Sequence, residues 1–271
     1  MNAARTTDPQ PEMKRLTSHD NPLFKELAKL AGSARQRKKA GQTLLDGAHL
    51  LAAYLDAGGK PLHVLTNVAA EQDNEIAALL KKLPGVPLTQ LDEKLFAELS
   101  ELKTPSGVLA LIAQPQPQIS AVRSHFALLL EDIQDPGNLG SLLRSAAAAG
   151  CDAAFLSEGC ADAWSPKVLR AGMGGHFALS IHETTDLPAV AAAFDGAVLA
   201  ASLAAGTTLY DCDLRGKLAF ALGNEGAGLS EAMLAAAGRR ITVPMPGKIE
   251  SLNVAAAGAV CLFEAARQRR R

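Results

Sequence analysis

Two hydrophobic patterns alternate along the first half of the chain. Apolar residues recur at i, i+3 and i+4 in some stretches, as on one helix face, and form short continuous runs in others, as in buried strands. The predicted helices are 22–41, with a basic end closed by Gly41, then the second part of 42–59, and 75–83 and 93–102. The predicted strands are the first part of 42–59, and 61–67 and 107–113.

The alternation stops at residues 114–125, a stretch rich in proline and glutamine. Its two prolines cannot join a central strand or a helix interior, so we expect a linker here. It separates an N-terminal domain, 18–113, from a C-terminal domain, 126–271. Residues 1–17 are polar, hold two prolines and show no periodicity, which predicts a disordered lead-in.

Beyond the linker, short and mostly apolar runs are again separated by helical patterns. Continuous apolar strands spaced by helices predict an α/β fold with a parallel sheet covered on both faces. The helix at 230–238 has Ser230 as its expected N-cap, and the final helix spans 251–271. The predicted strands are 127–133, 152–158, 178–183, 197–203, 218–224 and 240–245.

The composition narrows the class of protein. A formal net charge of −1 argues against binding of nucleic acid by bulk charge alone, but leaves room for a local basic face. The four cysteines form no CxxC pair, so we expect reduced thiols and no metal site. No apolar signal core or membrane-spanning stretch is evident, which predicts a soluble, cytoplasmic protein.

A first motif, DPGNLGSLLRSAAAAG, occupies residues 135–150 after an apolar run. As structure alone, it is a turn with Asn138 as the helix N-cap and Gly150 as the helix stop. Arg144 is not explained in this way. It is either a solvated charge or a cation that reaches into a cleft.

A second motif, LGNEGAGLS, spans residues 222–230 and holds three glycines. The glycines permit close backbone approach or positive φ. The motif is either a plain turn with an exposed Glu225, or a backbone cradle for a ligand in which Glu225 is a placed polar group.

A third motif, VPMPGKIESLNVAAAG, spans residues 243–258. Ser251 is the expected N-cap of the helix that follows. Asn253 is a poor helix former in a first turn that needs no second cap, so we expect it to serve function.

At these residues the chain resembles the SpoU (TrmH-like) family of RNA ribose 2′-O-methyltransferases, within the SPOUT class. Asn138 and Arg144 match the family's first motif, Asn224-Glu225-Gly226 the second, and residues 243–255 the third. The stretch SPKVLRAGMG resembles another family motif, with Gly172 where a serine is usual. The N-terminal part resembles a small substrate-binding domain through LLDGAHLLAAYLDAG, where Asp46-Gly47 replaces Glu-Gly, and LKTPSGVLALIA.

The resemblance implies a SPOUT domain with a deep trefoil knot, preceded by a small α/β RNA-binding domain. It also implies S-adenosylmethionine as cofactor and a homodimer packed through the knot, with Arg144 of one subunit near the cofactor of the other. The implied cofactor-binding residues are Gly223, Val243, Met245, Gly247 and Leu252. The implied catalytic residues are Asn138, Arg144, Glu225, Ser251 and Asn253, with no metal.

RNA is the expected partner, and ribosomal RNA is favoured over transfer RNA because an added domain suits a large substrate. The expected RNA contacts are Arg35, Arg37, Lys38, Lys39, Lys167 and Arg170, with Lys14, Arg15 and Lys25 as further candidates; a solvated helix face is the alternative. A non-catalytic RNA-binding protein on the same fold is the competing function. Another phosphate-binding α/β enzyme is a third, although the Rossmann and P-loop fingerprints are missing. Base methylation stays open, since related SPOUT enzymes modify bases.

Overall fold

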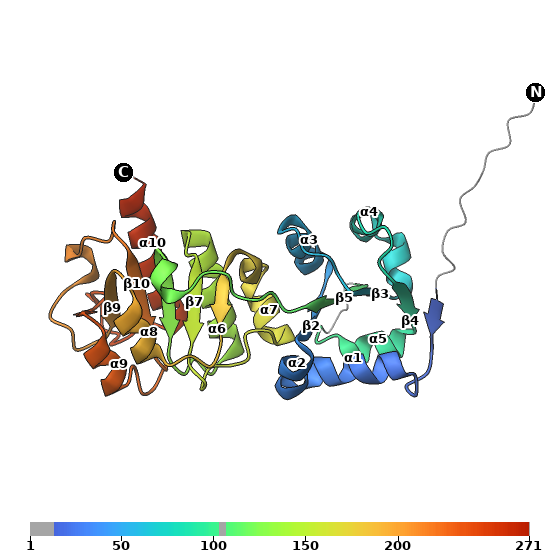
Figure 1. Cartoon of the computed structure of the whole chain (residues 1–271), viewed down its shortest axis with the longest axis horizontal. Coiled ribbons are helices and arrows are strands. Elements are labelled where there is room, and N and C mark those ends of the chain that lie inside the picture. Colours follow the sequence, from blue (N-terminus) through green and yellow to red (C-terminus); the bar gives the residue numbers. More distant parts are fainter. Residues whose placement is uncertain (1–13, 103–106, 271) are drawn as a thin grey trace, which may run out of the picture. The chain divides into compact units, whose positions relative to one another are not determined.

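The computed structural model describes residues 14–102 and 107–270 (Figure 1). Contacts divide the chain into two compact units. The N-terminal unit holds the described residues up to Leu51 and those between Lys60 and Ala113, and the C-terminal unit holds Ala52–Gly59 and the described residues from Gln114 onward. No helix in the described ranges is both long and apolar enough to cross a membrane.

The N-terminal unit is built on a five-stranded mixed sheet with the strand order β1-β4-β3-β5-β2. β1, β4 and β3 run parallel, and β5 pairs antiparallel with both β3 and β2. The strands are β1 (Lys14–Leu16), β2 (Gln42–Asp46), β3 (His63–Thr66), β4 (Leu88–Leu91) and β5 (Val108–Ala113). The helices are α1 (Pro22–Gly32), α2 (Ala34–Ala40), α4 (Asn74–Lys81) and α5 (Glu93–Leu99). The helix α3 (Ala48–Asp56) begins in this unit, and its residues from Ala52 onward belong to the C-terminal unit.

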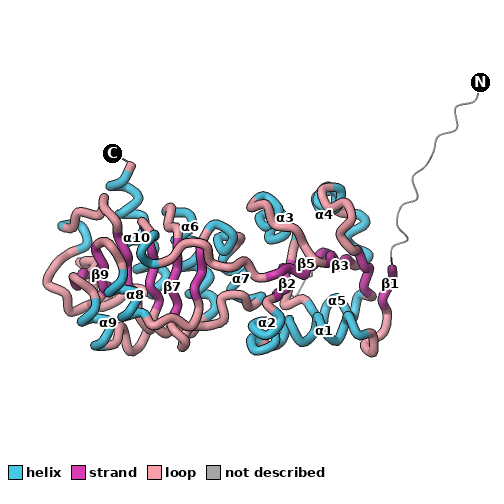
Figure 2. The backbone as a smooth tube through the Cα atoms, viewed as in Figure 1, coloured by secondary structure: helices cyan, strands magenta, loops and turns pink. Residues whose placement is uncertain are grey.

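The core of this unit lies between its sheet and the pair α1 and α5. These two helices lie side by side on one face of the sheet, and α4 lies on the other (Figure 2). The helical spacing of apolar residues expected from the sequence supplies this core, because one face of each helix is buried. The buried helix residues are Phe24, Leu27, Leu30, Leu95, Phe96 and Leu99.

Two strands of this sheet were not expected. Lys14–Leu16 fall in the predicted lead-in, yet they pair with β4, and Leu16 is 3% exposed. Residues 1–13 of that lead-in lie outside the described residues. β4 was missed because its middle positions, Thr89 and Gln90, are polar; both are buried and hydrogen-bonded, to His63 and Glu71 respectively.

The single helix expected over 22–41 is two helices that meet at Ser33. The Ser33 backbone N–H donates to Lys29 O, where α1 ends. The Ser33 Oγ accepts from the Gln36 N–H and so caps the start of α2. Arg37 then reaches back to the end of α1, where Nη1 donates to Leu30 O at 2.6 Å and to Ala31 O at 2.9 Å.

The prediction that Arg37 contacts RNA is therefore corrected. The side chain is 4% exposed, because its guanidinium satisfies helix-end carbonyls that would otherwise lack partners. Arg35, Lys38 and Lys39 are exposed.

The C-terminal unit is built on a six-stranded sheet, all parallel, with the order β11-β9-β10-β6-β7-β8. The strands are β6 (Phe126–Leu130), β7 (Ala153–Leu156), β8 (Ser180–His182), β9 (Ala197–Ala201), β10 (Leu218–Leu222) and β11 (Arg239–Ile241). The helices are α6 (Pro136–Ala149), α7 (Pro166–Gly172), α8 (Leu187–Ala193), α9 (Glu231–Ala236) and α10 (Val254–Arg269).

Helices cover both faces of this sheet, which confirms the predicted fold class. One core joins α8 and α9 to Ala219 and Ala221 of β10. Side chains alternate along a strand, so Leu222 points to the opposite face. There α10 packs close to β10 and α6: a Cβ at Gly258 would lie 2.4 Å from Leu142 Cδ2 and 2.8 Å from Leu222 Cδ1. The trefoil knot stays a prediction.

Beside α6, α7 packs closely through two glycines. A Cβ at Gly140 would lie 2.5 Å from the Cβ of Ala171, and one at Gly172 would lie 2.4 Å from Cε1 of His176. The buried His176 ring therefore explains why a glycine stands where the resembled motif has a serine. His176 is fully buried, and its Nε2 donates to Ala163 O at 2.8 Å.

We expect His176 to make stability depend on pH. Burial lowers its pKa from 6.5 to about 4, so the unfolded chain binds a proton there more readily than the folded one. The stabilisation is complete above pH 6.5 and is lost as the pH falls towards 4, to a total of about 3 kcal/mol. Chemical denaturation of wild type and His176→Gln across this range measures it. Parallel pH profiles for the two proteins would contradict it.

Candidate functional site

The three sequence motifs follow strands of the C-terminal sheet, and two of these strands are neighbours. β6 and β10 are paired in register, Leu130 with Leu222, and the Glu131 N–H donates to Leu222 O at 2.9 Å. The loops that leave these two strands therefore start side by side at the carboxyl edge of the sheet. Ligand sites of open parallel sheets lie at this edge.

A chain of side-chain hydrogen bonds joins one residue from each motif. Asn253 Nδ2 donates to Asn138 Oδ1 at 2.9 Å, and Asn138 Nδ2 donates to Glu225 Oε1 at 2.6 Å. These residues are 115 and 87 positions apart in sequence. The fold thus brings three of the five predicted catalytic residues into one contiguous polar group.

The donor and acceptor roles along these hydrogen bonds are set at the N-terminus of α10. Asn253 Oδ1 accepts from the Ala255 and Ala256 N–H groups, so it is the N-cap of α10. Its NH₂ group must then point away from the helix, toward Asn138. Asn138 consequently presents its oxygen to Asn253 and its NH₂ to the Glu225 carboxylate, which can only accept when ionised.

Two predicted caps were assigned to the wrong residues. α6 is capped by Asp135, whose Oδ1 accepts from the Asn138 N–H at 2.7 Å, which leaves the Asn138 side chain free for the site. α10 is capped by Asn253 and not by Ser251, so Asn253 does have a structural task in addition to its bond to Asn138. The Ser230 cap of α9 is confirmed.

The loop that carries Glu225 is shaped by its neighbour Asn224. Asn224 Oδ1 accepts from the Gly226 and Ala227 N–H groups, and its Nδ2 donates to Asp132 O at 3.0 Å. Gly223 is needed for close approach, since a Cβ there would lie 2.3 Å from the carbonyl of Gly228.

Asp132, at the end of β6, was not singled out from the sequence. Its φ of 54° is unusual for a residue other than glycine, and Ser157 holds it there by donating Oγ–H to Oδ1 at 2.6 Å. Such outliers persist where surrounding bonds hold them and cluster at functional sites. Here the conformation aims the Asp132 carbonyl at Asn224.

The backbone groups of the loop between β11 and α10 make no hydrogen bonds to other described backbone groups over residues 244–252. Ile249 and Leu252 of this loop are 71% and 40% exposed. Donors and acceptors without backbone partners, beside exposed apolar side chains, suit a ligand that has both an edge of polar atoms and an apolar face. An adenine ring is such a group, so this loop fits S-adenosylmethionine.

Two predicted catalytic residues stand apart from the hydrogen-bonded chain. Arg144 and Ser251 are exposed, and neither side chain has a hydrogen bond or ion pair within 14–102 and 107–270. Lys167 and Arg170 are likewise exposed on α7. No group of three metal-ligating side chains occurs among the described residues.

Comparison with known proteins gives the class that this fold and site define. Residues 125–263 match the model of the SpoU rRNA Methylase family, and residues 21–110 match that of the MRM3-like substrate binding domain. The chain belongs to the SpoU rRNA methylase family. It is an α/β RNA methyltransferase that uses S-adenosylmethionine.

Particular relatives match over almost their whole length. The chain is 35% identical over 257 residues to an uncharacterized tRNA/rRNA methyltransferase of Synechocystis, covering 93% of each chain. It is 31% identical to the 23S rRNA (guanosine(2553)-2′-O)-methyltransferase RlmP of Bacillus subtilis, covering 93% of this chain and 98% of RlmP.

Solved structures of methyltransferases are also similar to this chain. The AdoMet complex of the SpoU methyltransferase AviRb from Streptomyces viridochromogenes has a TM-score of 0.80 at 26% identity, covering 92% of this chain and 99% of AviRb. The AdoMet-bound rRNA methyltransferase from Sinorhizobium meliloti has a TM-score of 0.80 at 28% identity, covering 94% and 98%.

An Asn253→Asp substitution should separate the two tasks of this residue. Aspartate still caps α10, so thermal unfolding should not change, but it cannot donate to Asn138 and places a negative charge beside its oxygen. Loss of this bond should lower kcat by about tenfold. Asn253→Ala, the matched variant, should also lose about 1 kcal/mol of stability. A wild-type kcat for Asn253→Asp would show that the bond to Asn138 has no separate role.

Proposed function

We propose that the chain transfers a methyl group from S-adenosylmethionine to a ribose 2′-hydroxyl of large-subunit ribosomal RNA, in the cytoplasm. The observation that carries this proposal is the bonded group Asn253–Asn138–Glu225, which aligns polar side chains at the sheet edge beside a loop that fits the cofactor. RlmP, by its name, methylates a guanosine 2′-hydroxyl of 23S rRNA. Transfer RNA is the second candidate, because the name of the Synechocystis relative includes it.

The reaction requires that the two reactants be aligned and that the 2′-hydroxyl, a very weak acid, lose its proton. When bound, S-adenosylmethionine supplies a methyl group on a sulfonium, which is already an activated leaving group. Holding the ribose oxygen in line with that methyl group can supply about 7–11 kcal/mol of barrier reduction. Asn138 and Glu225 would orient the ribose, because the carboxylate has a second oxygen to accept from a hydroxyl.

Arg144 would assist the loss of the hydroxyl proton without taking it. A guanidinium stays protonated in proteins, so it is not a literal base. As a permanent cation it would lower the free energy of the developing alkoxide, and it could also hold the adjacent phosphate. Ser251 would position the substrate. Backbone groups at Gly223, Val243, Met245, Gly247 and Leu252 would hold the cofactor within the knot.

We also propose that the active enzyme is a homodimer packed through the knot region. The exposed apolar residues Leu203, Tyr210, Ile249 and Leu252 of the C-terminal unit support this, with exposed fractions of 66%, 55%, 71% and 40%. A dimer would also give Arg144 a site on the partner, since no group among the described residues of its own chain bonds to it.

Methyl transfer to unmodified RNA tests this function. Wild-type protein with radiolabelled S-adenosylmethionine should label ribosomal RNA, and nucleoside digestion should give a 2′-O-methylnucleoside. Arg144→Ala should lose about 100-fold or more in kcat. Arg144→Lys should fall between them, because it keeps the charge but not the planar fork.

Each other result has a clear meaning. Label found only in transfer RNA would show that transfer RNA, and not ribosomal RNA, is the substrate. A methylated base among the nucleosides would show that the base, and not the ribose, accepts the methyl group. Cofactor binding is the control for the Arg144 variants, since a loss of binding would assign their defect to the cofactor site.

A further inference from the structure

The basic residues of the N-terminal unit are concentrated in one segment. Residues 14–40 hold eight Lys and Arg side chains and two carboxylates, whereas the whole chain has a net charge of −1. The remainder of the chain is therefore acidic in sum. Charge gathered in this way on one segment, here β1, α1 and α2, is typical of a surface that meets nucleic acid.

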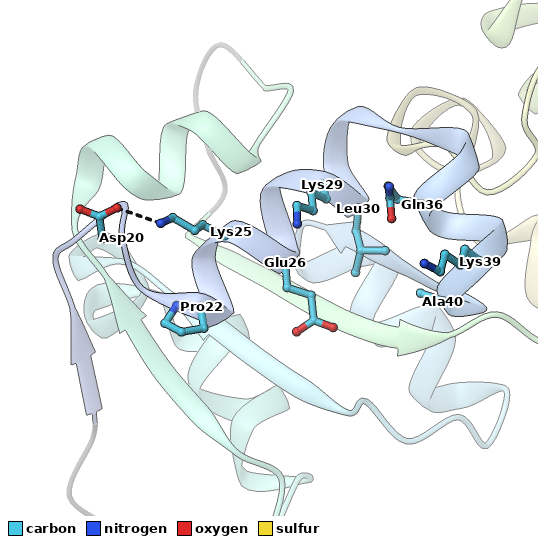
Figure 3. A pocket seen from close by; sticks show the side chains of 9 residues that line it. All are labelled: Asp20, Pro22, Lys25, Glu26, Lys29, Leu30, Gln36, Lys39 and Ala40. Atoms are coloured by element: carbon cyan, nitrogen blue, oxygen red, sulfur yellow. Dashed lines mark hydrogen bonds and ion pairs between the residues drawn. The ribbon is translucent and has the colours of Figure 1, made fainter.

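An open hollow of about 580 Å³ lies along the two helices of this segment (Figure 3). This volume falls within the range of ligand sites, about 300–1,000 Å³. Small-molecule sites are lined mainly by apolar and aromatic side chains, but this lining has no aromatic ring and is mostly polar. Its polar residues are Asp20, Lys25, Glu26, Lys29, Gln36 and Lys39.

The charges divide along the hollow. At one end Lys25 is paired with Asp20 at 2.8 Å, which balances that cation. Lys29 of α1 and Lys39 of α2 line the rest with Gln36 (Figure 3). Neither ammonium group has a hydrogen bond or ion pair within the described part of the chain, and Glu26 is the other carboxylate of the lining. The end formed by both helices is therefore positive.

Arg37 ties together the two helices that form this positive end. Its buried guanidinium joins the last carbonyls of α1 to the body of α2, which fixes the angle between the helices and thereby the places of Lys29 and Lys39. The angle between the helices is thus set before RNA binds, so that only the lysine side chains have to be ordered on binding. The hollow differs in this respect from the face of a single solvated helix.

We propose that the hollow between α1 and α2 binds a phosphodiester of the RNA substrate, with Lys29 and Lys39 as its contacts and Arg37 as a positioning residue. The proposal rests on the proposed function, because it takes RNA as the substrate. Contacts of this kind fix the position of an RNA without reading its sequence. The hollow would hold the RNA while the site of the C-terminal unit methylates it.

The salt dependence of RNA binding tests the proposal. Filter binding of a radiolabelled large-subunit rRNA transcript between 50 and 200 mM KCl, about the range over which phosphate contacts show, gives the slope of log Kd against log salt. The double variant Lys29→Ala/Lys39→Ala should reduce this slope by about 2 and raise Kd and KM about tenfold, with kcat unchanged. Lys29→Arg/Lys39→Arg should restore the slope.

The matched control is Lys81→Ala/Lys82→Ala, which removes the same charge from the exposed end of α4. This control should keep the wild-type slope. A wild-type slope for the Lys29/Lys39 variant, or an equal decrease in the control, would overturn the proposal. Wild-type protein that binds the transcript but methylates no RNA would instead overturn the proposed function.

Discussion

The site depends on a single run of aligned dipoles that begins at the N-terminus of α10. Two free N–H groups of that helix fix the oxygen of Asn253, Asn253 fixes the amide of Asn138, and Asn138 fixes one oxygen of Glu225. No member can rotate without breaking the next bond. A helix end thus sets the orientation of a carboxylate on another loop, and three distant segments become one rigid group.

The parallel sheet makes this arrangement possible. Adjacent β6 and β10 end at the same edge, so the motif-one and motif-two loops start together. Locally unfavourable features are then held by neighbours: Asp132 keeps a positive φ because Ser157 and Asn224 bond to it. The third loop, residues 244–252, keeps its backbone groups unbonded to other backbone, so that they remain accessible to a ligand.

Much of the fold could be read from the sequence, because apolar periodicity and turn residues are local signals. The parallel sheet with helices on both faces follows from continuous apolar runs, and Gly41 and Gly150 end their helices as expected. The errors arise where the local structure depends on a hydrogen-bond partner that is distant in the sequence. Thr89 and Gln90 form a strand only because neighbours bond to them, and Arg37 turns inward to cap a helix that the sequence shows as continuous.

The same reason limits what could be predicted of the site. Asn138, Glu225 and Asn253 were identified by their motifs, but sequence could not show that Asn253 both caps a helix and donates to Asn138. Asp132 gave no sequence signal, because positive φ at an aspartate depends on a serine 25 residues away.

The most direct test of the central claim is a double-mutant cycle on kcat/KM between Asn253→Asp and Glu225→Gln. Among the described residues, Asn138 alone bonds to both, so the run of dipoles predicts a coupling of about 1 kcal/mol that disappears in an Asn138→Ala background. Effects that add to within about 0.5 kcal/mol in the presence of Asn138 would mean that the three residues act independently, and would contradict the account.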